Sequence, residues 1–133
     1  MITIFFAPDL PKVDIINYKE NLKDLILKIK EYSKVPILCN LQPISNAGFY
    51  STYKEIADYI KDPAIDPFGW QRKYSDACQQ VATSLGIKFI DIRTPLESSF
   101  NNIWCPDGMH PNDEGHAIIA QVIIRSLGEI RVI

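Results

Sequence analysis

Residues 107–120 read DGMHPNDEGHAIIA, a polar loop that runs directly into an apolar helical segment. In this loop Asp107 and His110 are separated by only two residues. A carboxylate that accepts a hydrogen bond from one imidazole nitrogen fixes the tautomer of the ring, and the other nitrogen can then take a proton from a hydroxyl nucleophile. Asp107 and His110 therefore have the composition and spacing of the acid–base part of a catalytic triad.

Hydrophobic periodicity on both sides of this loop indicates alternating strands and helices. Runs of β-branched and apolar residues predict buried strands at 2–6, 35–39 and 87–92. Apolar residues at helical spacing predict helices at about 13–33, 70–85 and 113–127. Gly86 is expected to end the second helix and Asn112 to cap the start of the third.

For two segments the sequence also predicts which side chains are buried. The predicted helix at 13–33 should bury one apolar stripe and turn its lysines to water. The stripe consists of Ile15, Tyr18, Leu22, Leu25, Ile26 and Ile29. The segment 46–70 holds six of the fourteen aromatic residues and resembles a helix between two loops. Its rings could form a pocket wall, although ordinary packing is favoured for any single ring.

Strands separated by helices imply right-handed crossovers and a parallel sheet with helices on both faces. Residues 1–133 are therefore expected to form a single α/β domain. Functional groups in such sheets gather beyond the carboxyl ends of the strands. Asp9, Asn40, Arg93 and the Asp107–His110 loop should all lie on that side.

The composition is that of a globular protein without a strongly charged surface. The 133 residues include 14 basic and 16 acidic side chains, for a net charge of −2, and 47% are hydrophobic. The sequence contains no run of like charges of the kind that would indicate binding to nucleic acid. No apolar run is long enough to span a bilayer and no leader pattern is visible, so we expect a cytoplasmic protein.

The cysteines do not predict a metal centre. Cys39, Cys78 and Cys105 are odd in number and widely spaced, which fits neither a disulfide framework nor a zinc site. We expect no metal and no cofactor. Cys39 ends a predicted strand on the functional side and is an alternative nucleophile, but a small buried apolar role is favoured.

The block Asp-x-x-His-Pro-x-x-x-Gly-His at 107–116 resembles the last conserved block of the SGNH (GDSL-type) hydrolases, a family of esterases, lipases, thioesterases and deacetylases. Residues 2–22 resemble the family's third block, and 35–43 and 74–91 resemble elements between the two. The resemblance covers nearly the whole chain but only the later part of the usual family domain. It implies an N-terminally truncated, flavodoxin-like α/β/α sandwich in which Asp107 and His110 are catalytic.

The sequence departs from the family pattern at the nucleophile and at the oxyanion hole. It contains neither the family's Gly-Asp-Ser motif nor a Gly-x-Ser-x-Gly elbow. An ungapped alignment places Phe6 and Pro8 where the third block has Gly and Asn. Proline has neither a backbone N–H nor a side-chain donor, so Pro8 cannot stabilise an oxyanion. The isolated chain is therefore expected to hydrolyse simple esters poorly.

Two functional hypotheses follow from the resemblance. The first, favoured on family grounds, is a carboxylic ester hydrolase (an esterase, lipase or acetyl esterase) acting on a small ester or on an acylated sugar or lipid. It requires a serine that the sequence does not identify. The second is a catalytically silent remnant or interaction module, or one half of a split hydrolase.

The missing part of the domain also implies association. Without the preceding strands and helix, a sheet edge and apolar helix faces would be exposed. We therefore expect a homo-oligomer, such as a dimer, or pairing with a complementing N-terminal chain.

Overall fold

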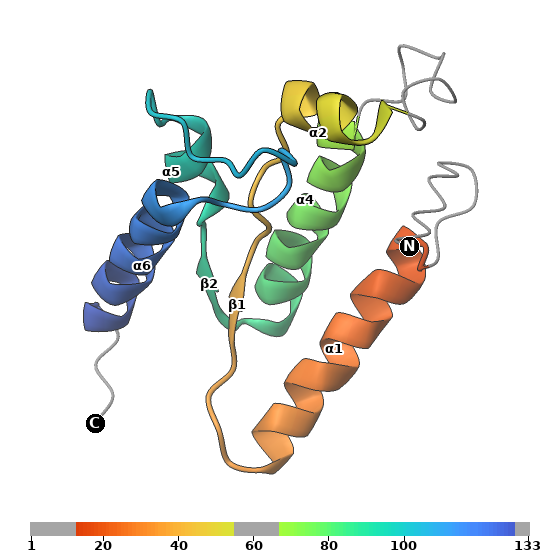
Figure 1. Cartoon of the computed structure of the whole chain (residues 1–133). Helices are drawn as coiled ribbons and strands as arrows, with labels where there is room; N and C mark the ends of the chain where they lie inside the picture. Colours follow the sequence, from red (N-terminus) through yellow and green to blue (C-terminus); the bar gives the residue numbers. More distant parts are fainter. Residues whose placement is uncertain (1–12, 55–66, 130–133) are drawn as a thin grey trace.

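The computed structural model describes residues 13–54 and 67–129, and its elements are labelled in Figure 1. The predicted strand at 2–6 lies outside these residues. The helices and strands are α1 (Ile15–Glu31), β1 (Ile37–Cys39), α2 (Asn46–Thr52), α4 (Pro67–Leu85), β2 (Lys88–Ile90), α5 (Arg93–Glu97) and α6 (Asp113–Gly128).

The described strands form a parallel pair at the centre of the fold. Leu38 of β1 is in register with Phe89 of β2, and the intervening α4 makes the crossover between the strands. Figure 1 shows α1 and α4 on one side of the strands and α5 and α6 on the other. Contacts of α4 with both strands and of α6 with β2 agree with this view. The structure thus confirms the predicted α/β class with a parallel sheet.

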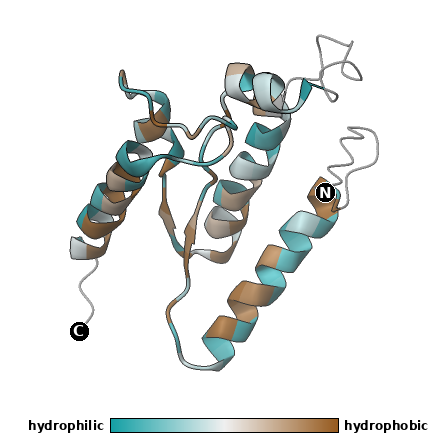
Figure 2. Cartoon of the chain, in the orientation of Figure 1, coloured by the Kyte–Doolittle hydropathy of each residue, from teal (hydrophilic) through white to brown (hydrophobic). Residues whose placement is uncertain are grey.

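The core lies where α4 meets the strands. Small and branched side chains on the inner face of α4 are almost completely buried, and they allow the helix to approach the sheet closely. These residues are Ala77, Cys78, Val81 and Ala82. Ile90 of β2 is buried with them. On the other side, Figure 2 shows α6 in hydrophobic colours over most of its length.

Helix α1 packs against α4 through a narrower stripe than the sequence predicts. The Tyr18 and Tyr74 rings meet edge to face with their centroids 5.0 Å apart, and Ile26 is buried. Leu25 and Ile29, which were predicted on the same stripe, are exposed instead. Within the described residues α1 packs mainly against α4, and packing on one helix buries positions spaced by four residues, so Leu25 and Ile29 lie beside that row.

The carboxyl ends of β1 and β2 are joined by a hydrogen-bonded clamp. Asn40 Nδ2 donates to Asp91 Oδ1 at 2.8 Å, and Asn40 Oδ1 accepts from the Ile92 amide at 2.8 Å. Partial burial would raise the pKa of Asp91, but hydrogen bonds from Thr94, Asn40 and the Arg93 amide outweigh it and hold the pKa below its usual value. The clamp fixes the edge of the sheet from which the functional loops leave.

The remaining elements depart from the sequence prediction in two places. Helix α4 begins at Pro67 rather than near residue 70, and α5 was not predicted at all. Within the described residues, none of the helices has both the length and the apolar character needed to cross a membrane.

Candidate active site

The Asp107–His110 loop forms a closed hydrogen-bonded turn. Asp107 Oδ1 accepts from the amides of Met109 at 2.9 Å and His110 at 3.0 Å, and Asp107 Oδ2 is hydrogen-bonded to His110 Nδ1. An ionised carboxylate can only accept hydrogen bonds, so Nδ1 carries the proton in this pair. The His110 side chain is 68% exposed, which leaves Nε2 accessible for proton transfer.

The same contacts keep Asp107 ionised. Partial burial alone would raise the pKa of Asp107, but the hydrogen bonds from the His110 amide, the His110 ring and the Met109 amide outweigh it. The pKa of Asp107 is therefore lower than that of an ordinary aspartate. An ionised carboxylate is the state needed to orient an imidazole and to stabilise its cationic form.

Asn112 fixes the loop to the start of α6. Its Oδ1 accepts from the Gly115 amide at 3.0 Å, which confirms the predicted N-cap. Its Nδ2 donates to the carbonyl oxygens of Asn102 at 2.8 Å and Trp104 at 3.2 Å. The helix terminus and the segment leading into the loop are thus held by one side chain.

Glycines allow the loop to lie directly against the chain that follows β1. Gly108 has φ +70°, and a Cβ at this position would lie 2.5 Å from both Ser45 O and Phe49 N. A Cβ on Gly48 would in turn lie 2.8 Å from Gly108 Cα. The Ser45 amide donates to Gly108 O at 2.7 Å, so the two loops form one unit.

The buried side chain of Arg93 connects the elements next to these two joined loops. Arg93 Nε donates to Glu97 Oε1 at 2.6 Å, Nη1 donates to Gln71 Oε1 at 2.5 Å, and the guanidinium carbon lies 4.8 Å from the centre of the Phe68 ring. Gln71 in turn donates to Gln42 O at 2.6 Å. Arg93 therefore connects α4 and α5 to the segment between β1 and α2.

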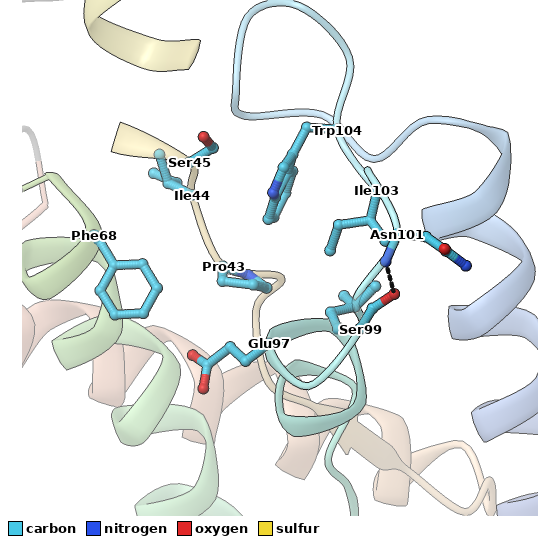
Figure 3. Close-up of a pocket in the computed structure, with 10 residues that line it drawn as sticks. Pro43, Ile44, Ser45, Phe68, Glu97, Ser99, Asn101, Ile103 and Trp104 are labelled. Carbon is cyan, nitrogen blue, oxygen red and sulfur yellow. Dashed lines mark hydrogen bonds between the residues drawn. The ribbon is translucent and has the colours of Figure 1, made fainter. Parts of the chain in front are cut away.

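Two adjoining pockets lie beside the joined loops. The first, with a volume of about 350 Å³, is shown in Figure 3. It is lined by Pro43, Ile44, Ser45, Phe68, Leu96, Glu97, Ser99, Asn101, Ile103 and Trp104. The second, of about 330 Å³, is lined by Ser45, Gly48, Asn102, Trp104, Cys105, Pro106 and Gly108. Ser45 and Trp104 belong to both pockets, and the second includes residues on each side of Asp107.

The other residues predicted to face this side have different roles. Asn40 belongs to the clamp between the strands and Arg93 is buried, so both support the site from within the fold. Asp9 lies outside the described residues. All three cysteines are free. Burial, with a smaller effect of Cys78, raises the pKa of the Cys39 thiol, which argues against a thiolate nucleophile at that position.

Comparison with known proteins identifies the family of this chain. The sequence profile of the GDSL-like lipase/acylhydrolase family matches residues 7–118. The chain belongs to this family. Within it, a GDSL esterase/lipase of Arabidopsis thaliana is 24% identical over 123 residues, which are 90% of this chain and 46% of that protein.

Solved esterases share the fold of this GDSL-like chain at low sequence identity. The acetylxylan esterase of Geobacillus stearothermophilus superposes with a TM-score of 0.65 at 21% identity, over 94% of this chain and 53% of the esterase. The esterase domain of a zebrafish retrotransposon ORF1 protein gives 0.64 at 17% identity, over 92% of this chain and 62% of that domain. The chain thus spans about half the length of these relatives.

Trp104, Glu97 and Ser99 were not predicted as parts of the site. They belong to the segment between β2 and α6. The hydrophobic pattern of this segment has no helical or strand period that would place the three side chains on one face. The only sequence signal was the position of Trp104, just before Asp107 in the same loop.

Proposed function

We propose that this chain carries the acid–base part of a carboxylic ester hydrolase, with His110 as the general base and acid and Asp107 as the residue that orients it. The observation that supports the proposal is the hydrogen bond between Asp107 Oδ2 and His110 Nδ1 beside an exposed Nε2. Family membership supplies the reaction class.

In the proposed reaction a serine hydroxyl attacks the acyl carbon while His110 Nε2 takes its proton. His110 then gives that proton to the oxygen of the departing alcohol, and an acyl-enzyme remains. Water attacks the acyl carbon in the second half of the cycle and loses a proton to Nε2. The acyl–serine bond then breaks, Nε2 returns this proton to the serine oxygen, and the carboxylic acid leaves. Throughout, Asp107 holds the ring through Nδ1 and stabilises the imidazolium by its negative charge.

The identity of the serine is a separate part of the proposal. A fluorophosphonate probe reacts with an activated serine, and mass spectrometry of the adduct identifies the residue. We expect slow labelling of one serine in the wild-type chain and in His116→Ala, and none in His110→Ala. Ser45 is the serine to inspect first, because it lines both pockets and its amide contacts the Asp107–His110 loop.

A chain that neither labels nor hydrolyses esters would instead favour the second hypothesis, a silent remnant or interaction module. In that event the serine of an active enzyme would have to come from another polypeptide. The residual background rate would then be the same with and without His110.

We also propose that this chain associates, either with a second copy or with a complementing chain. Several large apolar side chains of α1, its following loop and α6 are exposed, and an interface with another chain would remove them from water. They include Ile16, Leu25, Leu27, Tyr32, Val35 and Ile124. Light scattering should detect an assembly larger than one chain, and Ile16→Glu combined with Leu25→Glu should weaken it. A wild-type monomer at high concentration would contradict the proposal.

A further inference from the structure

We propose that the pocket of Figure 3 binds the sugar ring of an acylated sugar, with Trp104 as the stacking platform and Glu97 as a hydrogen-bond acceptor. The inference rests on the proposed function, because it assigns the alcohol part of the ester that the Asp107–His110 site would cleave.

Aromatic rings stand on two sides of this pocket. In Figure 3, Phe68 and Trp104 lie on opposite sides, with Pro43 between them. Trp104 is half-buried, so one part of the indole packs on the protein and another part remains available to a ligand. The C–H bonds on the face of a sugar ring carry partial positive charge, and the face of an aromatic ring carries partial negative charge. A flat indole therefore suits a pyranose face.

The polar groups of the pocket complement hydroxyl groups. Glu97 lines the pocket, and its side chain is 28% exposed. Arg93 Nε donates to Glu97 Oε1 at 2.6 Å, and Arg72 Nη1 lies 3.7 Å from the same oxygen. Ser45 Oγ accepts from the Gly48 amide and Ser99 Oγ accepts from the Asn101 amide. The Ser99 hydroxyl can therefore direct its own proton toward a ligand, and so can Ser45 if another serine is the nucleophile. An acceptor and a donor next to aromatic rings match a polyol.

The same groups disfavour an acyl chain in this pocket. A fatty acyl chain would remove the exposed part of the Glu97 side chain from water and leave the carboxylate with only its contacts to Arg93 and Arg72, which is costly for an ionised group. A sugar hydroxyl replaces the lost water with a charge-assisted hydrogen bond. The chemistry of the lining therefore selects the sugar part of an ester rather than a long acyl part.

The position of the pocket agrees with this assignment. It shares Ser45 and Trp104 with the second pocket, which includes Pro106 and Gly108 on either side of Asp107. A ring stacked on Trp104 would direct an acyl substituent into the second pocket, beside the Asp107–His110 loop. The two pockets would thus separate the alcohol part from the acyl part.

The test is a binding titration, which does not depend on catalysis. Methyl β-xylopyranoside and methyl β-glucopyranoside are added to the ¹⁵N-labelled full chain, with octanoate in a parallel series, and the indole N–H signal of Trp104 is followed by NMR. The two sugars should shift this signal with dissociation constants in the millimolar range, and octanoate should not. The same result is expected in His110→Ala, so sugar binding without ester hydrolysis would overturn the proposed function alone.

Variants test the two named residues. Trp104→Ala should weaken sugar binding about three- to tenfold, as expected for the loss of one aromatic contact. Phe100→Ala is the matched control, because Phe100 is exposed in the same segment and does not line the pocket. Glu97→Gln, which keeps the shape of the side chain, should also weaken binding. No shift with either sugar, a shift with octanoate alone, or equal binding by Trp104→Ala would overturn the inference.

Discussion

His110→Ala is expected to lower the hydrolysis of p-nitrophenyl acetate by about 10²–10⁴-fold, the range that a positioned general base contributes. The wild-type rate should itself be low, because the ungapped sequence alignment has Pro8 in place of the family's oxyanion-hole Asn, and the loss of one such donor costs about 10²–10³ in turnover. The measurement is the initial rate of p-nitrophenol release by equal amounts of folded wild type and variant.

His116→Ala is the matched control for that experiment. His116 is the other histidine of the chain and is exposed on α6, one helical turn beyond the Asn112 cap. Its substitution should leave the rate unchanged. Equal rates for wild type and His110→Ala would remove the general base from the account and would favour a silent module.

Gly108→Ala is expected to be the most destabilising single-methyl change in the described part of the chain. The methyl group would lie 2.5 Å from two backbone atoms, Ser45 O and Phe49 N, which cannot move without separating the two loops. The positive φ of Gly108 adds conformational strain. Overpacking and strain together should lower the free energy of unfolding by about 3 kcal/mol or more, as measured by urea denaturation.

Gly86→Ala separates the two causes. Gly86 also has a positive φ, but a Cβ at this position would meet nothing within 4 Å. This variant should therefore show only the conformational cost of about 1–2 kcal/mol. If Gly108→Ala lowered the free energy of unfolding no more than Gly86→Ala does, the contact between the two loops would be loose.

The elements that the sequence predicted well are those with long periodic signals. The three helices that became α1, α4 and α6 were placed to within a few residues, and Asn112 was correctly identified as the cap of α6. The short helix α5 has too few residues for a period, and Pro95 within it is a poor helix former. Its position follows from tertiary contacts, which include the Arg93–Glu97 ion pair.

The contacts of the candidate site also differ in how far the sequence could predict them. The hydrogen bond between Asp107 and His110 was predictable because both residues lie in one short loop. The contact of that loop with Gly48 and Ser45 was not, because it joins residues distant in sequence through backbone atoms. The stripe of α1 was predicted too wide, since a periodic pattern cannot specify how many neighbours a helix has.

The most direct measurement of the central claim is the tautomer of the His110 ring. Long-range ¹H–¹⁵N NMR distinguishes protonation at Nδ1 from protonation at Nε2, and the ring of His116 is an internal control in the same spectrum. The account predicts that neutral His110 is protonated at Nδ1 in the wild type and shifts toward Nε2 protonation in Asp107→Ala, while His116 does not change. Nε2 protonation in the wild type, or the same tautomer with and without the Asp107 carboxylate, would contradict it.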